Sequence, residues 1–146
     1  MMEHKPRVVM MGLGYIGLPT AALIASKGVN VTGVDISQKV VNTINEGKIH
    51  IVEPDLDGLV HYVVKEGFLK AATIPVEADV YLIAVPTPFK NDYVPDLSYV
   101  ESAVINLIPT LTKGALVILE STSPVGTTHK IQEIIFQHRP ELKGEI

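Results

Sequence analysis

The sequence contains no cysteine and no tryptophan among its 146 residues. Without cysteine, the chain forms no disulfide, offers no thiolate to a metal and has no thiol nucleophile. The five histidines stand at positions 4, 50, 61, 129 and 138, and this spacing matches no metal-binding motif. We therefore expect no metal site, and we expect each histidine to lie on the surface or to serve packing.

Clusters of basic residues and long apolar runs are also missing. Twelve Lys and Arg residues against sixteen Asp and Glu residues give a net charge of −4, which disfavours a nucleic-acid-binding surface. No apolar run approaches the roughly 20 residues of a membrane-spanning helix. Residues 1–7 lack the apolar segment and cleavage site of a secretory signal. These absences predict a cytoplasmic protein that binds neither nucleic acid nor membranes.

The segments that remain alternate between two patterns. Continuous apolar runs predict strands over about 7–11, 30–35, 69–73, 80–85 and 116–120. Helical spacing predicts helices over about 15–27, 38–45, 55–65 and 97–111, and a last helix within 124–137. Continuous apolar strands are typical of parallel sheets that are covered on both faces. The sequence therefore predicts a single α/β domain, a Rossmann-like doubly wound parallel sheet with helices on both faces.

A glycine motif joins the first predicted strand to the first helix. Gly12 permits a tight turn, Gly14 removes the side chain that would block a diphosphate, and Gly17 allows close packing of the helix. The free backbone amides around Tyr15 and Ile16, together with the helix dipole, attract phosphate without a basic side chain. This arrangement predicts a dinucleotide-binding turn.

An acidic residue, Asp35, ends the second predicted strand at the distance from the glycine motif that dinucleotide-binding domains require. Its carboxylate would accept hydrogen bonds from the adenosine ribose hydroxyls and repel a 2′-phosphate. The expected cofactor is therefore NAD rather than NADP. Flavin binding uses the same turn and stays an open alternative.

Thr87 follows the fourth predicted strand, between two prolines that hold it in an extended loop. Because ligands of open parallel sheets bind at the carboxyl ends of the strands, its hydroxyl and backbone are candidates to contact the nicotinamide ribose. A rigid turn that binds no ligand is the alternative.

A segment rich in hydroxyl groups, 120–128, follows the fifth predicted strand. Thr122, which lies nearest to the strand end, favours a ligand contact, whereas helix capping is the competing role of Ser123, Thr127 and Thr128. Glu120 is either a general base or a partly buried carboxylate that accepts hydrogen bonds from backbone N–H groups. A serine hydrolase is disfavoured because the Gly-x-Ser-x-Gly elbow is absent.

Several segments together resemble the UDP-sugar 6-dehydrogenases, the UDP-glucose/GDP-mannose dehydrogenase family. They are GLGYIGLPTAA (12–22), VDI (34–36), AVPTPF (84–89) and ESTSPVGTT (120–128). Two further segments, EGKIHIVEPDL (46–56) and PVEAD (75–79), are similar to the branch that oxidises UDP-N-acetyl-D-mannosamine.

This resemblance implies a four-electron oxidation of the sugar C6 hydroxyl to a carboxylate, which uses two NAD molecules and a cysteine-bound intermediate. It implies NAD contacts from the Tyr15 and Ile16 backbone, Asp35, Thr87, Thr122 and Thr128. Thr122 would also help to hold the catalytic water or the oxyanion, a supporting catalytic role. Lys39 lies one position before the basic residue that the family often has, so we assign it no role.

The family continues beyond these motifs into a general-base glutamate, a catalytic cysteine and a UDP-sugar-binding domain. The resemblance therefore implies that residues 1–146 are a truncated NAD-binding domain that is inactive alone. UDP-sugar binding and a homodimer would belong to the full-length enzyme. Two alternatives stay open, a dehydrogenase of another UDP-sugar (UDP-glucose or UDP-N-acetylglucosamine) and a free-standing NAD-sensing module without enzyme activity.

Overall fold

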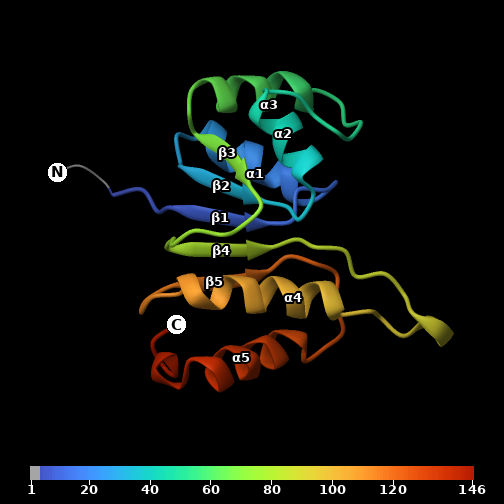
Figure 1. Ribbon diagram of the computed structural model, residues 1–146, viewed down its shortest axis with the longest axis vertical. Coiled ribbons are helices and arrows are strands. Elements are labelled where there is room, and N and C mark those ends of the chain that lie inside the picture. The colour runs from blue at the N-terminus through green and yellow to red at the C-terminus, as the bar shows by residue number, and fades with distance from the viewer. Residues whose placement is uncertain (1–3) are drawn as a thin grey trace.

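Five short strands form one parallel sheet in the computed structural model, which describes residues 4–146 (Figure 1). The strand order is β3-β2-β1-β4-β5. The strands are β1 (Val8–Met11), β2 (Val31–Val34), β3 (Leu69–Ala72), β4 (Val80–Ile83) and β5 (Leu116–Leu119). The order reverses between β1 and β4, and this arrangement confirms the predicted doubly wound sheet.

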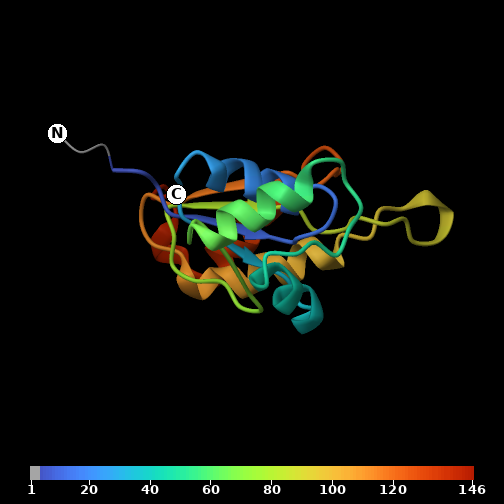
Figure 2. The same ribbon diagram turned by 90° about the horizontal axis from the view of Figure 1, so that it is seen from above.

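Helices cover both faces of the sheet, as predicted. They are α1 (Gly17–Ser26), α2 (Gln38–Asn45), α3 (Leu56–Lys65), α4 (Ser98–Leu107) and α5 (Thr127–His138). The first three pack beside β1, β2 and β3, while α4 and α5 lie in the other half of the molecule (Figures 1 and 2). Short 3₁₀ turns occur at Asn91–Tyr93, Ile108–Thr110 and Pro140–Leu142.

Two separate apolar layers explain why the strands read as continuous apolar runs. In β1, Val8 and Met10 face the layer beneath α1 and α3, whereas Val9 and Met11 face the layer beneath α4 and α5. All four side chains are buried. Burial on both faces is what the sequence pattern predicted.

Some predicted element boundaries differ from the structure. The helix predicted over 97–111 ends at Leu107 and continues only as a 3₁₀ turn, because Pro109 has no N–H to extend the α-helix. The last helix, predicted within 124–137, begins at Thr127, after Gly126 in a left-handed conformation with φ of +90°, and ends at His138. The strand predicted to end at residue 85 ends at Ile83.

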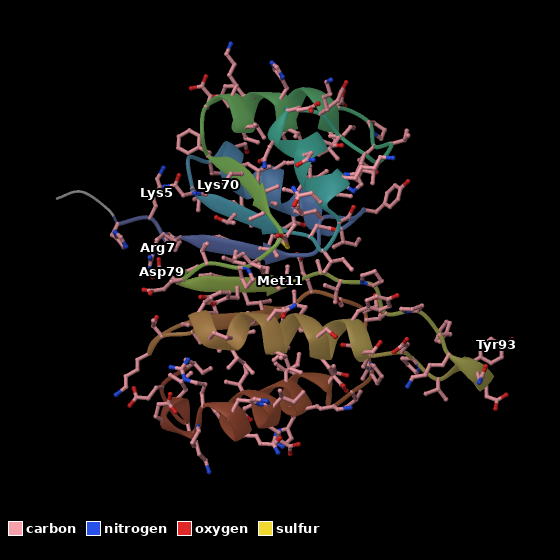
Figure 3. The ribbon with its side chains drawn as sticks, viewed as in Figure 1. Lys5, Arg7, Met11, Lys70, Asp79 and Tyr93 are labelled. Carbon is pink, nitrogen blue, oxygen red and sulfur yellow. The ribbon has the colours of Figure 1, made fainter. Side chains whose placement is uncertain are left out.

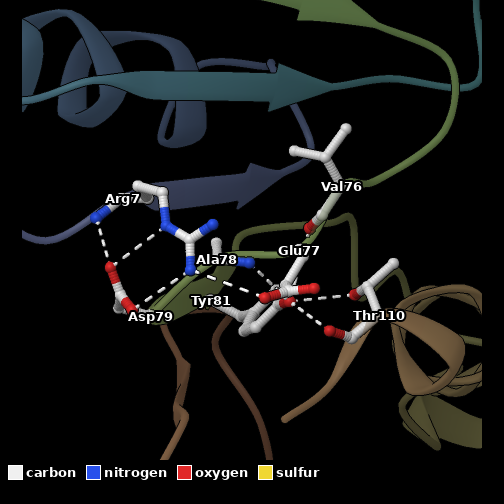
Figure 4. Close-up of polar contacts among 7 residues, drawn as sticks. All are labelled: Arg7, Val76, Glu77, Ala78, Asp79, Tyr81 and Thr110. Carbon is white, nitrogen blue, oxygen red and sulfur yellow. Dashed lines mark hydrogen bonds and ion pairs between the residues drawn. The ribbon is translucent and has the colours of Figure 1, made fainter.

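A polar cluster fixes the amino-terminal edge of the sheet (Figure 4). The carboxylate of Asp79 accepts hydrogen bonds from the Arg7 backbone N–H, at 2.7 Å, and from the Arg7 guanidinium, at 3.4 Å. The hydroxyl of the fully buried Tyr81 accepts from the Ala78 N–H, at 2.9 Å, and contacts Thr110. These contacts anchor the crossover from β3 to β4 at the edge opposite to the glycine turn.

The segment 86–97 projects from the carboxyl edge, beyond the end of β4 (Figure 2). Tyr93 lies at its tip, far from Arg7 and Asp79 at the amino edge (Figure 3). The rings of Phe89 and Tyr93 pack edge to face with centroids 6.0 Å apart, and both side chains are exposed. The main chain of the projection closes on itself through the hydrogen bond from Lys90 N–H to the Val94 carbonyl.

No helix within residues 4–146 is long and apolar enough to cross a membrane. The first three residues of the N-terminal segment considered above lie outside the described residues.

Candidate functional site

The glycine turn lies at the carboxyl edge of the sheet, at the point where the strand order reverses. Gly12 has φ of +98°, and a Cβ atom added there would lie 2.5 Å from the carbonyl oxygen of Ala84. Its N–H donates to the Val34 carbonyl at 2.7 Å. Both the conformation and the close approach of β4 therefore require glycine at position 12.

The other two glycines of the motif differ in what surrounds them. A Cβ atom at Gly17 would overlap the carbonyl oxygen of Gly12 and lie 3.4 Å from the Ala84 Cβ. A Cβ atom at Gly14 would meet nothing within 4 Å. Gly17 thus serves the packing of the turn itself, whereas Gly14 leaves open space above it.

The backbone amides at the start of α1 face that open space. The Leu18 N–H donates to the Gly14 carbonyl at 3.1 Å, which begins the helical hydrogen bonding. Within residues 4–146, the N–H groups of Tyr15 and Ile16 have no hydrogen-bond acceptor, and both side chains are exposed. These amides are therefore available to bind an anion at a helix N-terminus.

Asp35 follows β2 and reaches back to the glycine turn. Its Oδ2 atom accepts from the Leu13 N–H at 3.2 Å, and its Oδ1 atom accepts from the Ser37 N–H at 3.0 Å. A carboxylate has about four acceptor sites, so two of them remain for a ligand. The two hydrogen bonds from backbone N–H groups hold the carboxylate in place beside the turn.

A groove of about 480 Å³ opens beside Asp35. Its residues come from the ends of β1, β2, β3 and β4 and from α4, and they include Gly12, Asp35 and Pro86. None of them carries a positive charge, and Lys39, which is exposed, is not among them. The groove has the volume of a small-molecule site and offers no cation to a 2′-phosphate.

Three polar groove residues were missed by the sequence reasoning, Tyr99, Ser102 and Asn106 on α4. Their spacing places them on one helix face, and this is the signal that could have identified them. The helical spacing alone does not show that this face lines a groove, because only the folded chain places α4 beside the ends of the strands.

The loops after β4 and β5 are joined by Ser121. Its hydroxyl donates to the Val85 carbonyl at 2.8 Å, and its N–H donates to the Ile83 carbonyl at 3.1 Å. Thr87, two residues beyond Val85, is half-buried, and Thr122 is exposed at the start of the β5 loop. Ser121 therefore has a positioning role in the loops that carry these two candidate residues.

Thr128 does not lie in the Asp35 groove. It lines a second groove, between β5 and α5, together with Leu119 and Phe136. The structure thus brings together the glycine turn and Asp35 but places Thr128 on the outer side of the sheet.

Two hypotheses for the 120–128 segment are wrong, that a hydroxyl side chain caps the following helix and that Glu120 is partly buried. Gly126 occupies the N-cap position of α5 without any side-chain cap, and the Thr127 hydroxyl donates to the Pro124 carbonyl instead. Glu120 is exposed and accepts no amide hydrogen bond within the described part of the chain, so it is not the partly buried carboxylate considered above.

No group of three or more His, Asp or Glu side chains in residues 4–146 is placed to hold a metal ion. The open space above Gly14, the two free amides and the fixed carboxylate of Asp35 instead suit the diphosphate and ribose of a dinucleotide.

Residues 6–146 match the family model described as "UDP-glucose/GDP-mannose dehydrogenase family, NAD binding domain". The chain belongs to this family. The predictions of an NAD-binding domain and of NAD as the cofactor are thereby confirmed, in preference to a flavin.

Individual members of the family are similar over almost the whole chain. The UDP-N-acetyl-D-mannosamine dehydrogenase of Escherichia coli K12 is 62% identical over 135 residues, which cover 92% of this chain and 32% of that protein. An NDP-N-acetyl-D-galactosaminuronic acid dehydrogenase of Ralstonia nicotianae is 55% identical with the same coverage. The chain therefore spans about a third of the length of the curated relatives it matches.

The solved structure of a UDP-N-acetyl-mannosamine dehydrogenase of Staphylococcus aureus superposes with a TM-score of 0.86 at 39% identity. The superposition covers 90% of this chain and 33% of that one. The family resemblance noted in the sequence thus extends to the three-dimensional fold.

Proposed function

We propose that this chain is the NAD-binding domain of a UDP-N-acetyl-D-mannosamine 6-dehydrogenase. The observation that carries the proposal is the glycine turn with free amides beside the fixed carboxylate of Asp35. The identity of 62% to an enzyme named for this sugar supports the choice of substrate.

The complete enzyme would convert UDP-N-acetylmannosamine, two NAD⁺ and water into the uronate, two NADH and protons. NAD supplies the hydride acceptor for each of the two oxidation steps. This chain contains no cysteine, the nucleophile that the family resemblance implies, so we expect it to bind NAD without oxidising the sugar by itself. A fluorescence assay for NADH with UDP-N-acetylmannosamine checks this expectation.

The residues of this chain would bind and orient the cofactor. The Tyr15 and Ile16 amides would hold the diphosphate above Gly14, since both the dipole and the N–H groups of α1 favour an anion there. Asp35 would accept hydrogen bonds from the adenosine ribose. Gly12 and Gly17 would keep the turn closed.

Thr87, Thr122 and Thr128 would serve the nicotinamide half, with Thr122 also supporting the catalytic water or oxyanion. Thr87 and Thr122 follow the ends of the adjacent strands β4 and β5, which supports their assignment. The assignment of Thr128 has the least support of the three, because this residue lines the groove on the outer side of β5.

A dehydrogenase of a different nucleotide sugar is the second candidate. The relative from Ralstonia nicotianae, named for an N-acetylgalactosaminuronic acid, is 55% identical to this chain. The sequence similarity of the cofactor domain alone therefore distinguishes these substrates poorly. An assay of a full-length enzyme against several UDP-sugars decides between them.

Calorimetric titration with NAD and NADP tests the cofactor assignment directly. We expect NAD to bind more tightly than NADP, and we expect Asp35→Ala to weaken NAD binding about tenfold, as loss of one or two hydrogen bonds to a charged group implies. Glu53→Gln, at an exposed carboxylate outside the groove, is the matched control. Tighter binding of NADP would contradict the assignment.

The homodimer and the cytoplasmic location expected from the sequence remain proposals for the full-length enzyme. Light scattering after size-exclusion chromatography checks the first.

A further inference from the structure

We propose that residues 88–96 form a docking arm, whose tip binds the part of the complete enzyme that holds the UDP-sugar. The inference rests on the proposed function, because that function requires a second part of the protein to deliver the sugar to the cofactor. It assigns a role to Phe89 and Tyr93, two side chains that none of the expected NAD contacts includes.

The arm is a hairpin with hydrogen bonds of its own. Phe89 and Pro95 form an antiparallel bridge between its two sides. Closer to the tip, the Lys90 N–H donates to the Val94 carbonyl at 2.6 Å. The backbone is thus ordered before any partner binds, so the arm can present its tip at a low cost in conformational entropy.

The turn at the tip places a tyrosine where the backbone favours glycine. Asp92 and Tyr93 have positive φ, of 58° and 61°. The Val94 N–H donates to the Asn91 carbonyl at 3.3 Å across them. Two successive residues of positive φ are typical of the type I′ hairpin turn, whose second central position prefers glycine. The chain therefore keeps the Tyr93 side chain at a cost in backbone strain, and strain of this kind clusters at functional sites.

The side chains of the tip are apolar and exposed. Tyr93 is 85% exposed, Phe89 69% and Val94 52%. The two rings pack edge to face, and Figure 3 shows Tyr93 at the far end of the arm, clear of the sheet and its helices. Protruding aromatic side chains on an ordered backbone are typical of residues that fill a pocket on another protein surface.

The position of the arm indicates which partner it meets. The arm continues the chain beyond Thr87, at the carboxyl edge where the proposed nicotinamide site lies (Figure 2). Hydride transfer requires the sugar C6 atom to lie about 3–3.5 Å from the nicotinamide ring. The part of the enzyme that holds the sugar must therefore cover this edge, and the arm extends from the same edge.

The length of the relatives supplies a partner of sufficient size. The region similar to this chain covers only 32% of the UDP-N-acetyl-D-mannosamine dehydrogenase of Escherichia coli K12. In a complete enzyme of that length, two-thirds of the protein is available to bind the sugar and to form a pocket for the arm.

Hydrogen–deuterium exchange compares the arm in residues 1–146 with the arm in the full-length enzyme. Docking predicts that the backbone N–H groups of residues 89–95 exchange severalfold more slowly in the full-length enzyme. Equal exchange in the two forms overturns the inference. Slower exchange in residues 1–146 alone, as their concentration rises, identifies a second copy of the chain as the occupant and also overturns it.

Tyr93→Gly tests the side chain without threatening the fold, because glycine adopts positive φ without strain. We expect residues 1–146 to bind NAD unchanged. In the full-length enzyme, we expect kcat/KM for UDP-N-acetylmannosamine to fall about tenfold, as truncation of an aromatic side chain at the centre of an interface implies. Tyr93→Phe keeps the ring and most of the activity. Tyr62→Ala, at an exposed tyrosine on α3, is the control and changes neither quantity.

The outcomes separate this inference from the proposed function. An unchanged kcat/KM for Tyr93→Gly overturns the docking arm. Weaker binding of NAD to residues 1–146 carrying Tyr93→Gly also overturns it, because the side chain would then act on the cofactor. If the unaltered full-length enzyme oxidises no UDP-sugar, the proposed function itself fails, and the exchange experiment still reports whether the arm is covered.

Discussion

At the scale of single residues, the glycines of the turn differ in what a side chain would contact. Gly17→Ala would push a methyl group into the Gly12 carbonyl, so we expect a loss of about 1–3 kcal/mol in the free energy of unfolding. Gly14→Ala meets no protein atom within 4 Å, and we expect unchanged stability but weaker NAD binding. Urea denaturation and calorimetric titration of both variants check this contrast, which equal effects on stability would contradict.

A second residue-scale prediction concerns Asp79. Hydrogen bonds from the Arg7 backbone N–H and then from its guanidinium lower the pKa of the Asp79 carboxyl from its usual value of 3.8. Because the folded state favours the ionised form, the stabilisation is fully present above that value and is lost as the pH falls through the lower folded pKa. Asp79→Asn should therefore reduce stability at pH 7 and make little difference at the acid end of the titration.

Urea denaturation of Asp79→Asn across the acid range measures this effect, with Glu53→Gln as the control at an exposed carboxylate. If the difference in the free energy of unfolding between the unaltered chain and Asp79→Asn stays constant with pH, the ionic explanation is ruled out.

At the scale of elements, the two edge strands are treated differently. The Asn45 side chain, at the end of α2, donates to the Ala71 carbonyl at 2.9 Å and accepts from the Ala71 N–H at 2.8 Å. It thus occupies backbone groups of β3 that a further strand would otherwise pair. The other edge strand, β5, exposes Leu116 and Ile118.

Asn45→Ala should therefore destabilise the fold by about 1–3 kcal/mol, because both Ala71 backbone groups lose their partner. Asn42→Ala on the same helix removes only an exposed contact with Gln38 and is the matched control. Denaturant titrations of the two variants compare them, and equal stabilities would show that the Asn45 contact contributes nothing.

Local sequence signals predicted the elements well where the chain determines its own conformation. Ser37 accepts a hydrogen bond from the Val40 N–H at 3.3 Å at the start of α2, and Gly28 follows the end of α1 with φ of +79°. The sequence therefore predicted the start of α2 and the end of α1. The end of α4 was misplaced because Pro109, which has no N–H, interrupts the α-helical hydrogen bonds within an otherwise helical pattern.

At the scale of the whole molecule, the site divides into a part that the sequence shows and a part that only the fold assembles. The turn and Asp35 are linked by a known spacing, and their contact through the Leu13 N–H follows from it. Tyr99 and Asn106 follow Asp35 in the chain after two further strands, β3 and β4, and only the crossover at the reversal of strand order brings α4 to the groove. Residues of this kind need the three-dimensional structure.

The central claim is that the start of α1 and the carboxylate of Asp35 together hold NAD. A crystal structure of this chain with NAD tests it most directly. We predict the diphosphate on the Tyr15 and Ile16 amides, above Gly14, and the adenosine ribose on Asp35. A diphosphate bound elsewhere, or a ribose that does not contact Asp35, would contradict the account.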